Sequence, residues 1–257
     1  MRQVAIGVVI WSVFYIIVKK LPLDFIFPEY LKRTEMQNIE FRNRLVSFVH
    51  GLVALFYGCY HFIQEGAECG ALNTPLQRFV MVFSTSYFIY DLIFMYFEGI
   101  LDRAMTIHHP LCIFGMVLPL YENISGNFCM LAIFISEISN PAMHIRSMLR
   151  ETGRRYTKGY EVAEIAFISL YFYGRFFAAF SIVHETLKCQ SNHMFLKLTC
   201  MGLMVQSYYF IVLLAQILMK RIKEVLDRKK KGVKLSWLTP LAPEQVKLLN
   251  HKDVKVL

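Results

Sequence analysis

The sequence predicts an all-α, multi-pass membrane protein, a transmembrane helical bundle with about seven spans. Of its 257 residues, 56% are hydrophobic and only 18% are charged, whereas a soluble domain usually has about 25% charged residues. The charges are also unevenly placed, because long windows have almost none while the connections between them are rich in Lys and Arg. At roughly 20 apolar residues per span, a chain of this length has room for six or seven membrane helices and little else.

Seven apolar runs carry this prediction. In chain order they are residues 4–18, 45–63, 79–101, 106–121, 127–144, 162–187 and 195–219. The first run ends at Lys19-Lys20 and is followed by no small-residue cleavage site. We therefore interpret it as an uncleaved first helix rather than a signal peptide.

Two prolines set expectations for the fourth and fifth runs. The apolar stretch 110–121 is too short to cross a membrane alone. Starting this span four residues earlier brings the pair His108-His109 into it or to its entrance. Pro110 suits the first turn of a helix, where its missing N–H costs nothing, and Pro141 is expected to bend the fifth run.

The basic residues predict how the chain is oriented. Of the 28 Lys and Arg residues, 23 lie in alternate connections and the tail, at 19–44, 102–109, 145–161 and 220–257. Basic residues mark cytosolic loops and meet anionic lipid headgroups, so we expect the C-terminus in the cytosol and the N-terminus outside. The same reasoning explains the net charge of +9 by an anionic lipid surface, with no nucleic acid as partner.

We divide the chain into three regions, and the bounds of the middle region follow from the resemblance described below. Residues 1–41 are interpreted as an N-terminal transmembrane helix and a cytosolic linker, and residues 42–225 as a domain of six transmembrane helices. Residues 226–257 form a basic cytosolic tail, which is expected to be largely disordered because it has too few apolar residues to form a core.

The cysteines and the glycosylation sequon fit this orientation. Four of the six cysteines lie in apolar runs, where cysteine usually acts as a small hydrophobic residue. Cys69 and Cys189 fall in loops on the oxidising side, so a disulfide is one interpretation and two unpaired thiols is the other. The sequon at Asn123 lies on that same side, in a turn so short that we do not expect it to be modified.

Carboxylates interrupt the third run at helical spacing. If residues 87–102 form one helix, Asp91, Glu98 and Asp102 share one face, at offsets of seven and eleven. Glu98 and Asp102 can lie at the cytosolic interface, but Asp91 is too deep and needs a partner. The histidine pair is one candidate partner, and an ion pair with Arg175 is the structural alternative.

A second polar stripe lies in the fifth run, where Glu137, Asn140 and His144 are at offsets of three and seven. His50 in the second run and Arg175 in the sixth are further polar groups at membrane depth. Ionisable groups in a membrane are costly and usually face a protein interior or a wet cavity. We therefore expect these residues to converge on one cavity, the alternative being that each is neutralised locally.

The histidine pair is the sharpest candidate for chemistry. An imidazole with an ordinary pKa of about 6.5 can take a proton from a hydroxyl or an amine. Adjacent helical residues point about 100° apart, so both rings reach one cavity only at a helix end, which Pro110 favours. The alternative is a hydrated polar pair at the headgroup boundary. The eight histidines do not form the HxxxH and HxxHH clusters of membrane di-iron enzymes, so no metal is expected.

These residues, in this order, resemble the TLC-domain family. The matching pieces are Asn43-Arg44-Leu45-Val46-Ser47 with His50, Tyr87-Phe88-Ile89-Tyr90-Asp91-Leu92, His108-His109, and Glu137-Ile138-Ser139-Asn140-Pro141 followed by Arg146. The resemblance covers about residues 42–225. Two further pieces make it most similar to the TLC domain-containing protein 5 branch: Asn73-Thr74-Pro75-Leu76-Gln77 and Arg150-Glu151-Thr152-Gly153.

The resemblance implies six helices in a ring around a lipid-accessible tunnel, preceded by one extra helix. In the ceramide synthases of this family, the histidine pair takes part in acyl transfer from acyl-CoA to a long-chain amine. Carried over, His108 and His109 become the candidate base or acyl carrier, with Asp91 as the residue that orients them. The residues expected to line the tunnel are then His50, Glu98, Glu137, Asn140, His144 and Arg175.

Three functions remain open on the sequence alone. The first is acyl transfer from acyl-CoA to a lipid amine or hydroxyl in the endoplasmic reticulum or another endomembrane, with acyl-CoA as co-substrate and no cofactor. The second is a non-catalytic regulator of membrane lipid composition. The third is a structural or cargo-binding membrane protein. Membrane lipids are the expected partners in the first two, and a homodimer is left open.

Overall fold

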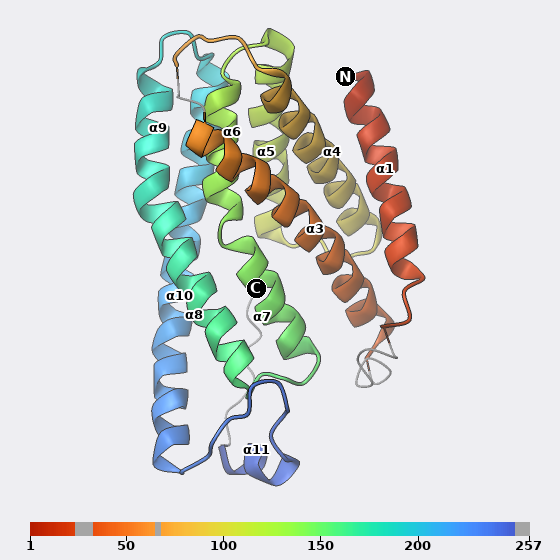
Figure 1. Ribbon diagram of the computed structural model, residues 1–257, viewed down its shortest axis with the longest axis vertical. Coiled ribbons are helices and arrows are strands. Elements are labelled where there is room, and N and C mark those ends of the chain that lie inside the picture. Colours follow the sequence, from red (N-terminus) through yellow and green to blue (C-terminus); the bar gives the residue numbers. More distant parts are fainter. Residues whose placement is uncertain (24–32, 65–67, 250–257) are drawn as a thin grey trace.

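The computed structural model describes residues 1–23, 33–64 and 68–249, which are helical almost throughout (Figure 1). The elements are α1 (Arg2–Lys19), α3 (Glu35–Gln64), α4 (Pro75–Phe97), α5 (Arg103–Glu122), α6 (Gly126–Glu137), α7 (Asn140–Glu151), α8 (Lys158–Phe172), the π-helix η2 (Tyr173–Ala178), α9 (Ala179–Lys188), α10 (Met194–Lys230) and α11 (Pro243–Leu249). Within this described part there is no strand, and Leu72 and Ile124 form an isolated bridge. Residues 24–32 of the predicted linker lie outside it.

Seven helical segments among the described residues are long and apolar enough to cross a membrane. α1, α3, α4, α5 and α10 each form one, α6 and α7 together form another, and α8, η2 and α9 form the last. This confirms the predicted all-α, multi-pass bundle. The predicted tunnel stays a prediction.

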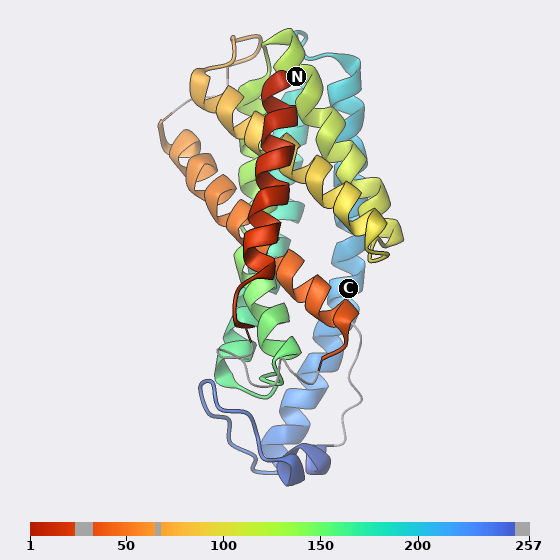
Figure 2. The same cartoon turned by 90° about the vertical axis from the view of Figure 1, so that its right-hand side faces the viewer.

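α1 packs along the outside of α4 and also contacts α3 (Figures 1 and 2). The Trp11 indole N–H donates to the Phe83 carbonyl at 3.3 Å, and its ring packs edge-on against Tyr87. At Gly7 the two helices approach so closely that a Cβ would lie 2.2 Å from Ser86 Oγ. The first helix is therefore an integral part of the packed bundle.

α3 runs diagonally across the bundle and contacts α4, α6 and α7 (Figure 1). Close approach is allowed by small residues on its inner face. A Cβ at Gly58 would lie 2.8 Å from the Cβ of Phe134 on α6. Because α3 touches these three helices as well as α1, its side chains can link groups that are far apart in the sequence.

The predicted third span differs from the structure at its end. α4 stops at Phe97, and Gly99 adopts a left-handed conformation with φ of 69°, which glycine permits without steric cost. Asp102 then accepts a hydrogen bond from the Met105 N–H as the N-cap of α5. The prediction that residues 87–102 form one helix is therefore wrong. Pro110 accordingly lies inside α5 rather than in its first turn.

The fifth predicted span is interrupted near Pro141, as expected. α6 ends at Glu137 and α7 begins at Asn140. Proline has no N–H to donate to the carbonyl four residues earlier, which here is that of Glu137, and it disfavours helical geometry in the residue before it. The break directs α7 away from the axis of α6 (Figure 1).

The sixth span contains one turn of π-helix, Tyr173–Ala178. Here Gly174 lies so close to α6 that a Cβ would be 2.7 Å from the Ile135 carbonyl oxygen. A π-helical turn shifts the faces of the residues that follow it. Positions on either side of η2 therefore do not keep one common α-helical register.

The basic tail is more ordered than predicted. α10 continues to Lys230, past the expected end of the seventh span, and α11 follows. The Ser236 and Trp237 carbonyls accept hydrogen bonds from the first backbone N–H groups of α8. The tail thus packs against the bundle as far as residue 249, and residues 250–257 lie outside the described part. With α7, α11 and the adjoining ends of α8 and α10, it forms what we call the basic end, which extends beyond the α4–α5 turn (Figures 1 and 2).

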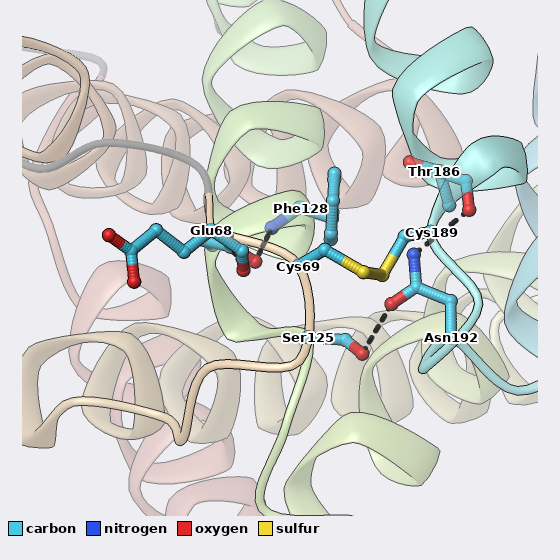
Figure 3. Close-up of a disulfide and its surroundings, with 8 residues drawn as sticks. Glu68, Cys69, Ser125, Phe128, Thr186, Cys189 and Asn192 are labelled. Atoms are coloured by element: carbon cyan, nitrogen blue, oxygen red, sulfur yellow. Dashed lines mark hydrogen bonds between the residues drawn. A yellow bond between two sulfur atoms is a disulfide. The ribbon is translucent and has the colours of Figure 1, made fainter.

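A disulfide joins two loops at the opposite end of the bundle (Figure 3). It connects Cys69, before α4, to Cys189, at the end of α9, across 120 residues of sequence. Next to it, Ser125 Oγ donates to Asn192 Oδ1 at 2.6 Å, and the Asn192 amide donates to the Thr186 carbonyl. Of the two sequence interpretations, the structure therefore supports the disulfide.

Candidate functional site

The polar residues predicted within the spans are mostly buried in a shared interior. Those with 6% or less of their surface exposed are His50, Asp91, His109, Glu137 and His144. They come from α3, α4, α5, α6 and α7. α3 connects them, because its residues 43–51 contact Asp91, His144 and Glu137 in turn.

Asp91 is the centre of a hydrogen-bonded network. One carboxylate oxygen accepts from the Asn43 amide at 2.6 Å, and the other lies 2.9 Å from His109 Nε2. The Tyr90 hydroxyl donates to the side-chain amide oxygen of Asn43, Oδ1, at 3.2 Å. The network joins α3, α4 and α5, and it is the histidine pair rather than Arg175 that provides the partner of Asp91.

Both ring nitrogens of His109 are already engaged. Nδ1 lies 3.0 Å from the Met105 carbonyl oxygen, which can only accept, so this nitrogen carries a hydrogen. Nε2 faces the Asp91 carboxyl group and shares a proton with it, whichever of the two holds it. His109 therefore has no ring nitrogen left to take a proton from a substrate.

His108 points elsewhere. Its ring lies 5.8 Å from that of His109, with the two planes at 89°. His108 Nδ1 lies 3.3 Å from Gln206 Oε1 on α10, and Cys112 Sγ is 3.5 Å from Nε2. The expectation that both rings reach one cavity at a helix end is therefore wrong, because the pair lies inside α5 and its two members face α4 and α10.

His50 is held mainly by aromatic rings. Its imidazole stacks on the Tyr87 ring with centroids 3.9 Å apart, and Nε2 lies 3.1 Å from Ser84 Oγ on α4. The Trp11 ring of α1 approaches its edge at 6.0 Å. These contacts make His50 a packed interior residue that connects three helices.

The second polar stripe lies where α6 gives way to α7. The Asn140 amide donates to Glu137 Oε2 at 2.8 Å. The same oxygen would be 3.0 Å from a Cβ placed at Gly51, so α3 covers this carboxylate closely. His144 packs edge-on against Phe48, and its Nδ1 has no hydrogen-bond partner among the described residues.

Glu98, expected in the same cavity, lies apart from Asp91 at the α4–α5 turn. Arg175 lies close enough to His108 and Glu137 for their charges to interact, but the partners of Asp91 are Asn43 and His109. The Arg175 guanidinium donates to Ser207 Oγ and to the Ser136 carbonyl, each at 3.3 Å, with Tyr171 beneath it. Glu98 is the C-cap residue of α4, seven positions after Asp91, at the α4–α5 turn. It is partly exposed there, in accord with the interface alternative.

A charged recess at the basic end was not predicted from the sequence. Glu164 accepts from Arg146 at 3.1 Å and from Arg221 at 2.6 Å, and Glu224 pairs with Arg155 and Arg221. All five side chains are largely buried. The recess is lined by these residues and by Arg150, Tyr160, Ile217 and Lys220. Its lining carries five basic groups against two acidic ones, so it favours an anion.

The sequence reasoning missed three residues of the interior. Asn43 was noticed only as part of a matching motif, although its amide bonds Asp91. Cys112 was taken as a small hydrophobic residue, although a spacing of four after His108 places both on one helical face. Gln206 is one of two glutamines in the seventh run, with Gln216, so the sequence held no signal that singled it out. No group of three metal-binding side chains occurs within the described ranges.

A protein-family model matches most of the chain. The family model described as the TLC domain matches residues 40–222, more than two thirds of the chain. This range includes every residue of the network around Asp91 and both histidines of the pair. No solved structure matches the chain.

Proposed function

The chain belongs to the TLC-domain family, and on that premise we propose that it transfers an acyl group from acyl-CoA to an amine or hydroxyl group of a membrane lipid. Family membership indicates a membrane lipid-related function, and with seven candidate spans the protein is an integral multi-pass membrane protein. We also propose that the protein belongs to the TLC domain-containing protein 5 branch of this family and that it resides in the endoplasmic reticulum or another endomembrane.

The observation that carries the proposal is the state of His108. Unlike His109, it does not bond a carboxyl group, and the residue is only half-buried. Gln206 engages Nδ1, which leaves Nε2 available to accept a proton. In this role His108 takes the proton of the attacking group and returns it to the sulfur of the departing CoA.

The depth of His108 fits this substrate. It is the sixth residue of α5, so at about 1.5 Å per residue it lies about 8 Å inside the α4–α5 turn. In acyl-CoA the thioester joins a charged nucleotide, which stays in water, to an apolar chain, which enters the membrane. The reacting carbonyl is therefore held near the interface, at about the depth of this imidazole.

The charged recess supports the same reading. It lies at the basic end, in the part of the bundle that extends beyond the α4–α5 turn (Figure 2). Arg150 and Lys220 complete the five basic groups of its lining, against the two carboxylates. Phosphate groups of CoA are the anions that such a cluster would attract, because guanidinium groups bind phosphate oxygens in a bidentate manner.

The network around Asp91 has a supporting role. Asp91, Asn43 and His109 tie α3, α4 and α5 together and fix the rotation of α5 about its axis. That rotation determines where His108 points. We therefore assign Asp91 and His109 to positioning, and His108 to proton transfer.

Turnover by the purified protein tests the proposal. The full chain in lipid nanodiscs is incubated with radiolabelled acyl-CoA and a mixed lipid extract, and new acylated lipid is measured. His108→Ala should reduce product formation at least 100-fold, while His184→Ala, which changes an exposed histidine beside Glu185, should leave it unchanged. Equal turnover by wild type and His108→Ala would contradict the assignment. Untargeted lipidomics of cells with and without the protein would identify the acceptor.

A second candidate is a non-catalytic regulator of lipid composition or a lipid- or cargo-binding protein. The observation in its favour is the cluster of basic side chains around the recess, which attracts an anionic headgroup without any chemistry. A lipid profile that changes on deletion of the protein and is restored by His108→Ala would support this candidate over acyl transfer.

A further inference from the structure

Cys112 lies one helical turn after His108 on α5, and its thiol faces the same imidazole. Sγ is 3.5 Å from Nε2 and 4.0 Å from Nδ1. Cys112 is half-buried, so it is partly accessible to a substrate. Cys129, by contrast, is buried and its thiol contacts the Gly115 carbonyl oxygen instead.

Gln206 determines which nitrogen of His108 faces the thiol. The Gln206 amide N–H₂ donates to the Ala104 carbonyl at 2.9 Å, so its oxygen must be the atom that faces His108 Nδ1. An amide oxygen accepts, and Nδ1 therefore carries the hydrogen of the neutral ring. Nε2 is then the unprotonated nitrogen, and it is the one nearest to Sγ.

A cysteine and a histidine four residues apart touch on many helices, so their contact alone would be ordinary packing. The third residue distinguishes this arrangement. Gln206 comes from α10, a different part of the chain, and is itself held by a backbone carbonyl of α5. A nucleophile, a base and a group that orients the base are the three parts of an activated nucleophile, as in cysteine proteases with Cys, His and Asn.

The geometry points to Cys112, His108 and Gln206 as a nucleophilic triad that carries the acyl group as a thioester on Cys112. This inference rests on the acyl transfer proposed above and divides it into two half-reactions. Cys112 and His108 are the catalytic residues, and Gln206 is a positioning residue.

In the first half-reaction, His108 Nε2 takes the thiol proton and the Cys112 sulfur attacks the thioester carbonyl of acyl-CoA. The carbon–sulfur bond to CoA breaks, and the CoA thiolate takes the proton from His108. In the second, His108 takes a proton from the lipid amine or hydroxyl, which attacks the acyl-Cys112 carbonyl. The Cys112 sulfur leaves and receives that proton. Both steps exchange an acyl group between nucleophiles, so neither needs an oxidant or a metal.

The two half-reactions also separate the substrates in time. CoA departs before the lipid acceptor reacts, so one imidazole serves both steps and the two bulky substrates need not be held together. In the first step the Cys112 thiol and the acyl-CoA thioester become an acyl-Cys112 thioester and the CoA thiol. The bond types do not change, so the step has little driving force in either direction, and free CoA can reverse it.

The test is covalent labelling of the full chain in lipid nanodiscs with an alkyne-tagged acyl-CoA and no lipid acceptor. Wild type should acquire a label that survives SDS, is released by neutral hydroxylamine and maps by peptide mass spectrometry to Cys112. Cys112→Ala should lose the label at least tenfold, while Cys200→Ala, which changes a free and similarly exposed thiol in α10, should keep it. Cys112→Ser should give an oxygen ester that resists neutral hydroxylamine.

Rescue by an added base separates catalysis from packing. His108→Ala and Gln206→Ala should label at least tenfold more slowly than wild type, and imidazole added to His108→Ala should restore part of the rate because it replaces the missing base. A merely structural role would give a loss that imidazole does not restore. Thermal midpoints of all variants, measured by size-exclusion of heated samples, verify that they are folded.

The outcomes also distinguish this inference from the function on which it rests. If Cys112→Ala forms acylated lipid at the wild-type rate, or the label maps to another residue, the triad is refuted and the acyl transfer stands. A label on Cys112 without lipid product supports the triad and refutes lipid as the acceptor. If wild type shows neither label nor product, both are refuted.

Discussion

A double-mutant cycle on Asp91 and His109 tests whether His109 is engaged by Asp91, so that only His108 is available for proton transfer. Their side chains are 6% and 3% exposed, and the two atoms are 2.9 Å apart. The perturbation is a double-mutant cycle of Asp91→Ala, His109→Ala and the double variant. If this pair is what engages His109, the two substitutions must be strongly coupled.

The size of the coupling follows from the geometry. Breaking a buried charged pair by removing one partner costs about 3–5 kcal/mol, because the other charge stays buried without compensation. A hydrogen bond to a charged group contributes about 1.5–3 kcal/mol, whereas neutral side-chain hydrogen bonds within membrane bundles average about 0.6 kcal/mol. We expect a coupling of at least about 1.5 kcal/mol if the pair is ionised, and about 0.6 kcal/mol if a neutral Asp91 and a neutral His109 share the proton.

The assay is equilibrium unfolding in mixed micelles, in which SDS is titrated into protein held in a mild detergent. The free energy of unfolding is obtained for wild type, both single variants and the double variant. Glu98→Ala is the matched control, because Glu98 is another carboxylate at the end of the same helix but is partly exposed. It should change the free energy of unfolding by less than about 0.5 kcal/mol.

Additive effects would refute the reasoning. If the double variant loses the sum of the two single losses, to within about 0.3–0.5 kcal/mol, then the side chains do not interact. His109 would then be as available to a substrate as His108, and the assignment of proton transfer to His108 alone would fall.

Two further predictions concern a close helix contact and the disulfide. Gly51→Ala would place a Cβ 3.0 Å from Glu137 Oε2, so we expect it to lower the free energy of unfolding by about 1–3 kcal/mol in the same titration. Gly115→Ala, where a Cβ would have more room, is the control. Equal effects of the two substitutions would contradict the close contact. Replacing Cys69 and Cys189 by serine should cost about 2–4 kcal/mol, and wild type, unlike the variant, should migrate differently on gels with and without reductant. Identical migration would mean that the two thiols are free.

Helix boundaries illustrate where sequence reasoning was incomplete. The apolar run of the third span gave no reason to stop before Leu101, yet α4 ends at Phe97. Gly99 in a left-handed conformation and Asp102 as an N-cap both act through the backbone at single positions. Hydropathy averages over many residues, so it does not register such local signals. The shared stripe of three carboxylates was predicted only because the whole apolar run was taken as one helix.

The candidate site shows a similar division. Asp91 was predicted to need a partner because a carboxylate at membrane depth is costly when alone, and the structure supplies His109 and Asn43. Glu98 lies at the α4–α5 turn instead, and Arg175 bonds Ser136 and Ser207 rather than Asp91. Spacing along one helix can place residues on one face, but it carries no information about which neighbouring helix covers that face.

The sequence by itself determined the all-helical, seven-span class, because crossing a hydrocarbon layer demands long apolar segments with every backbone group bonded internally. It also determined which buried groups must find partners. Only the tertiary structure decided that His109 bonds Asp91 while His108 turns to Gln206 and Cys112. Adjacent residues of a helix point about 100° apart, so the fate of each histidine depends on helices that are distant in the sequence and are positioned by packing.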